Sequence, residues 1–153
     1  MTRMRILCAC LGNSERSPFM AAILAQLLRN QGKNDILVES AGVLNTIVKG
    51  DPAPPLSIAA GRTYGLRLDL HRKKHIIDIV DFDAVELIVA ADKETQAALL
   101  PYNTKNVEVI CLNLDGRSNP WKSQNPRNFD DMITDIYAAL IREVIQYRFR
   151  VEG

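Results

Sequence analysis

The sequence has few cysteines, almost no net charge and no long hydrophobic run. Its three cysteines, Cys8, Cys10 and Cys111, show neither the paired spacing of a disulfide framework nor a Cys-x-x-Cys metal-binding pattern. With 19 basic and 18 acidic side chains the net charge is +1, which predicts neither nucleic acid nor a membrane surface as a partner. No apolar stretch approaches the ~20 residues of a membrane span, and the amino-terminal residues do not form a secretion signal. We therefore expect a cytoplasmic protein, and we predict no metal and no other cofactor.

Four apolar runs alternate with helical patterns along the 153 residues. The runs cover residues 6–10, 36–39, 85–91 and 107–112, and they are nearly continuous, as in parallel strands buried on both faces. Apolar residues at helical spacing predict helices over 18–30, 56–64, 92–100 and 129–149. The pattern predicts a single α/β domain over 1–153, a doubly wound three-layer sandwich. Its four-stranded parallel sheet would have the flavodoxin-like order 2-1-3-4.

The stretch that joins the first strand to the first helix reads CLGNSERS from Cys10 to Ser17. It lies at the topological switch point of the predicted sheet, where ligands bind in open α/β folds. Loop N–H groups and the start of a helix together bind anions, and Arg16 offers two parallel donors to a phosphate. A cysteine here is expected to be a thiolate, which predicts attack on phosphorus through a phosphocysteine. The alternative is a buried structural Cys10 beside a surface Arg16. We expect Ser17 to cap the helix, with Pro18 at its first position.

Residues 10–18, CLGNSERSP, resemble the phosphate loop of the low-molecular-weight protein tyrosine phosphatases. The resemblance continues through most of the chain. Further similar segments are Glu39-Ser40-Ala41-Gly42, Tyr64-Gly65-Leu66 with His71 after it, Ala91-Asp92, and Asn119-Pro120-Trp121 with Phe129 after it.

The resemblance implies a role for each residue of the loop. Cys10 would be the nucleophile, Arg16 would bind the phosphoryl group, and Ser17 would hydrogen-bond the sulfur. The backbone N–H groups that would hold the phosphoryl oxygens are those of Leu11, Gly12, Asn13, Ser14, Glu15 and Arg16.

The resemblance also implies residues that support the loop. Asn13, Ser40 and His71 would form a buried polar network, and Asp92, at the end of the third strand, would support the site. Two alternatives stay open at this point. Ser17 is only a helix cap, or His71 is only a histidine near a turn whose hydrogen bonds are satisfied.

The general acid is the main departure from the family. The position at which the family has an aspartate that protonates the leaving group is Asn119 here, and loss of a general acid typically costs about 10²–10⁴ in rate. We therefore expect slow hydrolysis, slowest for poor leaving groups. Asp115 is the alternative acid, although Asp115-Gly116 is also a strong turn signal.

Two further departures concern the loop and the substrate pocket. Glu15 stands where the family usually has a second cysteine; repulsion by a bound dianion predicts that it points to solvent, with proton donation as the alternative. Trp121 is predicted to stack on a substrate ring, or else only packs its loop. Thr46 and Ile47 stand where the family has an aromatic residue.

The leading hypothesis is a phosphatase for phosphotyrosine-type aryl phosphates, carried by a phosphorylated protein or a small molecule. Inorganic phosphate would be its product and inhibitor. The alternative is a catalytically impaired protein that binds phosphate or phosphotyrosine without turnover. An arsenate reductase would need more cysteines on a mobile segment, and residues 57–85 contain none. A sugar-transport phosphocarrier is disfavoured by Arg16 within the loop.

Overall fold

The computed structural model describes residues 4–79, 84–102, 107–114 and 126–149. The strands are β1 (Arg5–Cys10), β2 (Leu37–Gly42), β3 (Val85–Ala90) and β4 (Glu108–Cys111). The helices are α1 (Arg16–Asn30), α2 (Pro55–Thr63), α3 (Lys93–Ala98), α4 (Pro126–Leu140) and α5 (Gln146–Arg148), with a π-helical turn at Ile141–Ile145 and 3-10 turns at Leu68–Leu70 and Ile76–Asp78. Among the described residues, no helix is both long and apolar enough to cross a bilayer.

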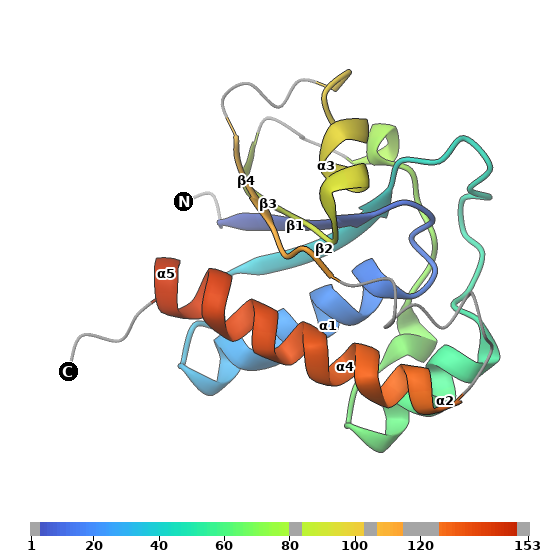
Figure 1. Cartoon of the computed structure of the whole chain (residues 1–153), viewed down its shortest axis with the longest axis vertical. Helices are drawn as coiled ribbons and strands as arrows, with labels where there is room; N and C mark the ends of the chain where they lie inside the picture. The colour runs from blue at the N-terminus through green and yellow to red at the C-terminus, as the bar shows by residue number, and fades with distance from the viewer. Residues whose placement is uncertain (1–3, 80–83, 103–106, 115–125, 150–153) are drawn as a thin grey trace.

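The four strands form one parallel sheet in the order β2-β1-β3-β4 (Figure 1). This confirms the predicted fold and strand order. Because β1 has β2 on one side and β3 on the other, the chain leaves its carboxyl end at the switch point of the sheet. Cys10 is the last residue of β1 and pairs with Gly42 of β2.

The two faces of the sheet are buried in two separate cores. Ile6, Cys8 and Cys10 of β1 belong to the core that includes residues of α1 and α4, whereas Leu7 and Ala9 belong to the other core, which includes Leu99 next to α3. Successive side chains of a strand point to opposite faces, so both sets must be apolar. Figure 1 shows α1, α2 and α4 on one side of the sheet and α3 on the other, a three-layer sandwich.

Two predicted boundaries next to the site were wrong. β2 continues to Gly42 instead of ending at 39, because Ser40, Ala41 and Gly42 pair with Cys8, Ala9 and Cys10. Helix α1 begins at Arg16 with Glu15 in the cap position, so Ser17 is not the cap.

The predicted carboxyl-terminal helix is also longer and less regular than expected. It begins at Pro126 rather than 129, and the π-helical turn interrupts it before α5. Val144 and Ile145 stay buried through this turn, so the apolar stripe continues against the sheet.

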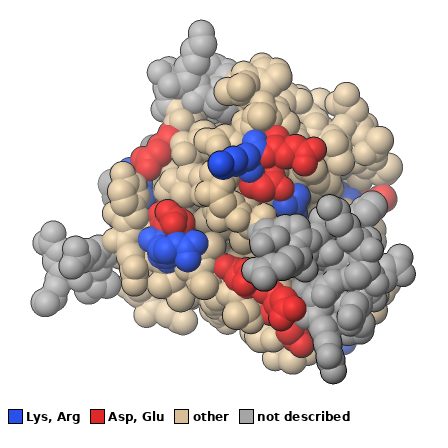
Figure 2. Space-filling view, viewed as in Figure 1, with Lys and Arg blue, Asp and Glu red and all other residues tan. Residues whose placement is uncertain are grey.

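Charged side chains on the face shown in Figure 2 are scattered among uncharged ones, and the described Lys and Arg residues lie beside Asp and Glu. The described part of this face therefore carries no extended basic patch of the kind that binds nucleic acid.

Candidate phosphate-binding site

The chain between β1 and α1 folds back over the end of the strand and surrounds the sulfur of Cys10. The Asn13 N–H donates to Cys10 Sγ over 3.2 Å, and Cys10 Sγ lies 3.0 Å from Ser17 Oγ in a second hydrogen bond. Cys10 is only 3% exposed. The side chain of Ser17 is therefore directed at the sulfur, and this explains why it does not cap α1.

Asn13 is the residue on which the loop is built. It is fully buried, and its backbone lies in the left-handed region at φ 52°, which asparagine tolerates better than most residues. Its Nδ2 donates to Ser17 Oγ over 2.9 Å and to Ser40 Oγ over 3.0 Å, and its Oδ1 accepts from the Lys74 N–H over 2.9 Å. The side chain thus joins the loop to β2 and to the segment after His71.

His71 approaches the same residue from the other side. Its Nε2 lies 2.8 Å from the Asn13 carbonyl oxygen, to which the ring N–H donates. Burial lowers the pKa of His71, the hydrogen bond to Asn13 opposes this, and the neighbouring Lys74, Lys73 and Arg72 lower the pKa further. The ring is therefore neutral near pH 7, and it supports the left-handed turn as a donor.

Arg16 is held by Asp92 from the end of β3. Arg16 Nη1 donates to Asp92 Oδ2 over 2.5 Å, and Asp92 Oδ1 accepts the Thr95 N–H over 2.8 Å as the cap of α3. Burial acts to raise the pKa of Asp92, but the hydrogen bonds from Arg16 and Thr95 outweigh it and the pKa lies below its usual value. An ionised Asp92 therefore fixes the guanidinium beside the loop.

Glu15 was predicted to point to solvent, and this was wrong. The residue is 9% exposed, and its Oε2 is buried without a hydrogen-bond partner among the described residues. Burial raises the pKa of Glu15 to about 7, although Arg16 and Lys73 act to lower it. The prediction considered only repulsion by a bound anion, whereas the packing of the loop against its neighbours encloses the side chain.

The loop is also held by backbone contacts that the sequence did not indicate. The Leu11 carbonyl accepts from the Val43 and Leu44 N–H groups over 2.9 and 3.0 Å. A Cβ on Gly42 would lie 2.7 Å from the Leu11 carbonyl and 2.9 Å from the Asn13 nitrogen, so only glycine fits there. The close approach explains why β2 ends in glycine.

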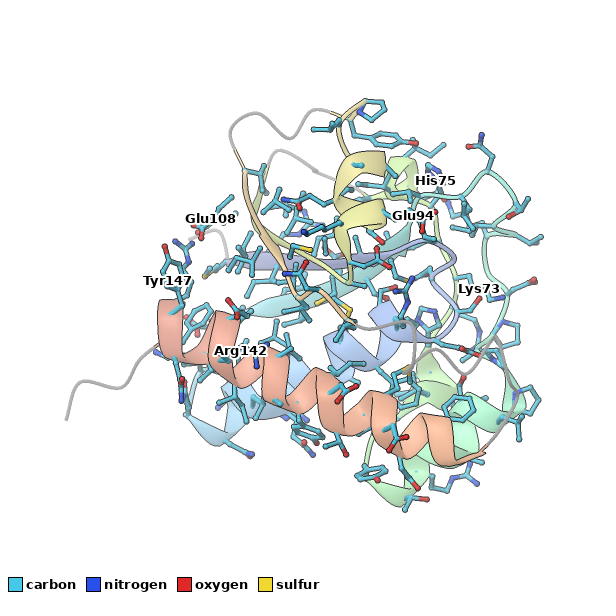
Figure 3. All side chains as sticks on the ribbon, in the orientation of Figure 1. Lys73, His75, Glu94, Glu108, Arg142 and Tyr147 are labelled. Atoms are coloured by element: carbon cyan, nitrogen blue, oxygen red, sulfur yellow. The ribbon has the colours of Figure 1, made fainter. Side chains whose placement is uncertain are left out.

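Residues 72–75 form an extended segment that runs beside the end of β2. The Gly42 N–H donates to the Lys74 carbonyl over 3.0 Å, and Lys73 exchanges hydrogen bonds with Gly50 and Asp51 at 2.8 and 2.7 Å. No pattern in the sequence predicted this segment, because it is short and charged. Figure 3 shows Lys73 on this segment, beside the loop that carries Cys10.

Ser14, another predicted residue of the loop, is 6% exposed, and its hydroxyl donates to the Gly12 carbonyl over 3.4 Å. Asn119, Trp121 and Asp115 lie outside the described residues.

The other described thiols take no part in this network. Cys8 is fully buried, and burial, together with the nearby Cys10, raises the pKa of its thiol. Cys111 lies on β4 and hydrogen-bonds Asn113. All three cysteines are free, and within the described ranges no group of three or more His, Cys, Asp or Glu side chains is placed to hold a metal ion.

Comparison with known proteins gives one family and a consistent fold. The model of the low molecular weight phosphotyrosine protein phosphatases matches residues 5–148. No curated protein matches the sequence.

Solved structures show the same fold at low sequence identity. The crystal structure of Primo-1 is 22% identical with a TM-score of 0.80, covering 95% of this chain and 99% of that one. A protein tyrosine phosphatase from Entamoeba histolytica is 21% identical with a TM-score of 0.78, covering 94% and 96%. The YwlE arginine phosphatase, as a variant with a phosphorylated active-site serine, is 18% identical with a TM-score of 0.77, covering 97% and 100%.

Proposed function

This chain belongs to the low molecular weight phosphotyrosine protein phosphatase family, and we propose that it hydrolyses aryl phosphates of the phosphotyrosine type through a phosphocysteine intermediate. Its family and fold are those of phosphatases. The observation that carries the finer proposal is the position of Cys10 Sγ, at the end of β1 and within hydrogen-bond distance of the Asn13 N–H and Ser17 Oγ.

The surroundings of the sulfur support a nucleophilic role. The Asn13 N–H donates to the sulfur, and α1 begins at Arg16, so the positive end of the helix faces the loop. Cys8, two residues earlier, has no such surroundings and a raised thiol pKa. A free nucleophilic thiol persists best in a reducing compartment, which supports the cytoplasmic location that the sequence predicts.

The proposed reaction has two steps. In the first, the Cys10 thiolate attacks phosphorus, the S–P bond forms, and the P–O bond to the aryl group breaks as Arg16 and the loop N–H groups stabilise the equatorial oxygens. In the second, water attacks phosphorus and the S–P bond breaks, releasing phosphate and a thiolate. The Ser17 hydroxyl, 3.0 Å from the sulfur, is placed to donate a hydrogen bond to this leaving thiolate.

The leaving oxygen needs a proton in the first step, and this is where we propose that the enzyme is slow. Asn119 has no proton to give near neutral pH, so phenolates of high pKa should leave slowly. Asn119→Asp is expected to raise kcat by about 10²–10⁴ for phenyl phosphate. The gain should be much smaller for p-nitrophenyl phosphate, whose leaving group needs little protonation.

The comparison of phenyl phosphate with p-nitrophenyl phosphate also tests whether Asp115 is the general acid. If Asp115 is already the acid, Asn119→Asp will change neither substrate's rate, and Asp115→Asn will slow phenyl phosphate selectively.

The substrate class is tested with peptides. The structural relatives include a tyrosine phosphatase and an arginine phosphatase. Release of phosphate from phosphotyrosine and phosphoarginine peptides of one sequence would decide between these classes. We expect the phosphotyrosine peptide to be the better substrate, with Trp121 stacking on its ring; Trp121→Ala should then raise KM more than it lowers kcat.

The alternative is a protein that binds phosphate or phosphotyrosine without turnover, which the asparagine at 119 favours. Hydrolysis of p-nitrophenyl phosphate at mildly acidic pH separates the two, with Cys10→Ser as the blank. Turnover that disappears in Cys10→Ser supports the enzyme. Tight binding of phosphate or vanadate without such turnover supports the binding protein.

A further inference from the structure

Glu15 is a buried carboxylate within the loop that is proposed to bind a dianion. It is 9% exposed, and its Oε2 has no hydrogen-bond partner in the described part of the chain. Its side chain does not cap α1, although Glu15 occupies the cap position and its carbonyl accepts the Phe19 N–H. Neither the stability of the helix nor the proposed reaction therefore accounts for this carboxyl group.

We propose that Glu15 links oxyanion binding to proton uptake: the loop accepts a doubly charged oxyanion once Glu15 is protonated and resists it while Glu15 is ionised. Glu15 is then a specificity-determining residue that acts through the charge of the loop without touching the reacting atoms. The inference rests on the proposed function in one respect, because it takes residues 11–16 as the oxyanion site.

Glu15 lies among other charged groups, and its own ionisation is the one that we expect to change between pH 6 and pH 8. Among the described residues, Arg16, next in sequence, and Lys73, on the extended segment beside the loop, are the cations whose charges act on Glu15. The charge of Arg16 is already shared with Asp92 at 2.5 Å. A carboxylate at Glu15 therefore adds a negative charge that a dianion in the loop must meet at close range.

Two other titratable groups lie near the loop, and their effects on binding must be distinguished from the effect of Glu15. The substitution Cys10→Ser removes the thiol of Cys10. His71 contacts the Asn13 carbonyl, and since burial lowers the pKa of His71, its titration falls on the acid side of this range.

The size of the expected effect follows from linkage. Burial raises the pKa of Glu15 to about 7. If binding requires the protonated form, the affinity for a dianion falls about tenfold between pH 6 and pH 8. Close to one proton is then taken up for each anion bound at pH 8, and close to none at pH 6.

Sulfate is the suitable probe because it keeps both charges throughout this range, whereas phosphate itself titrates. Sulfate binding to the Cys10→Ser protein is measured by isothermal titration calorimetry at pH 6, 7 and 8. Each titration is repeated in two buffers of different ionisation enthalpy, which gives the number of protons taken up. We expect the tenfold loss of affinity and the proton uptake described above.

The double variant Cys10→Ser/Glu15→Gln should bind sulfate with an affinity independent of pH, about tenfold tighter at pH 8 than Cys10→Ser. Cys10→Ser/Glu94→Gln is the matched control, since Glu94 is an exposed carboxylate at the start of α3 and its loss should leave the pH dependence in place. Circular dichroism and thermal unfolding establish that each variant is folded.

Sulfate binding without proton uptake in Cys10→Ser would overturn the inference and leave the oxyanion site intact; this readout does not depend on the Glu15 variant folding. A pH dependence that persists in Glu15→Gln, or that disappears in Glu94→Gln, would also overturn it. Absence of sulfate binding at every pH would instead refute the oxyanion site, and with it the proposed function.

Discussion

Replacement of Asn13 by alanine should destabilise the protein more than any other single truncation in the loop. The change removes the partner of the Ser40 hydroxyl at 3.0 Å and of the Lys74 N–H at 2.9 Å, and one of the partners of Ser17. Each buried polar group left without a partner costs about 1–3 kcal/mol. Alanine at φ 52° adds about 1–2 kcal/mol of backbone strain. The expected loss is about 3–8 kcal/mol.

The chain offers a matched control for the strain. Asn113 also has a left-handed backbone, at φ 53°, but it is exposed and its one described side-chain contact is a hydrogen bond of 3.4 Å with Cys111. Asn113→Ala should therefore cost about 1–2 kcal/mol, which is the strain alone. The free energy of unfolding of each variant is measured by urea denaturation at pH 7. If Asn13→Ala costs no more than Asn113→Ala, the hydrogen-bond network of Asn13 contributes nothing to stability.

Three further predictions concern stability and pH, and the same urea measurements check them. Asp92→Asn keeps an acceptor for the α3 cap but loses the ion pair with Arg16, so it should cost about 1–3 kcal/mol at pH 7. The pKa of Asp92 is lowered on folding. The cost of Asp92→Asn should therefore decrease as the pH falls below the usual aspartate pKa, and vanish below the pKa that Asp92 has in the folded protein. An equal cost at pH 3 and pH 7 would contradict the ion pair. The pKa of Glu15 rises from 4.5 to about 7 on folding, so stability is lost as the pH rises from 4.5 to about 7, and the loss is complete above pH 7. Glu15→Gln should stabilise the protein by about 1–3 kcal/mol at pH 8 and leave it unchanged at pH 4, and no gain at pH 8 would refute the buried charge. His71, whose pKa is lowered, takes up a proton more readily in the unfolded chain, so wild-type stability should fall between pH 7 and pH 5 by more than that of His71→Gln.

The fold was predictable because each strand is a continuous apolar run followed by an amphipathic segment. The strand ends were less predictable, because pairing and not hydrophobicity decides them there. Ser40, Ala41 and Gly42 are small or polar, and they belong to β2 since β1 holds them in register. The same pairing brings Ser40 to Asn13, which the resemblance implied and the local pattern did not.

The local part of the site could be predicted from the loop residues themselves, whereas the distant part was implied only by the family resemblance. Cys10, Arg16 and Ser17 are close in sequence, so the loop that joins them limits where they lie. The contacts of Asn13 with Lys74 and of Arg16 with Asp92 join residues 61 and 76 positions apart, and they depend on the register of segments without a strong pattern. The error at Glu15 had another cause, since the charge argument did not include the packing around the loop.

The most direct test of the proposed reaction is to look for the phosphoryl group on the nucleophile. The protein is mixed with p-nitrophenyl phosphate, quenched in acid within the first turnover and digested for mass spectrometry. We expect the peptide that contains Cys10 to gain the mass of one phosphoryl group, and to lose it as inorganic phosphate appears. Turnover with no phosphoryl group on Cys10, or turnover that persists in Cys10→Ser, would contradict the mechanism.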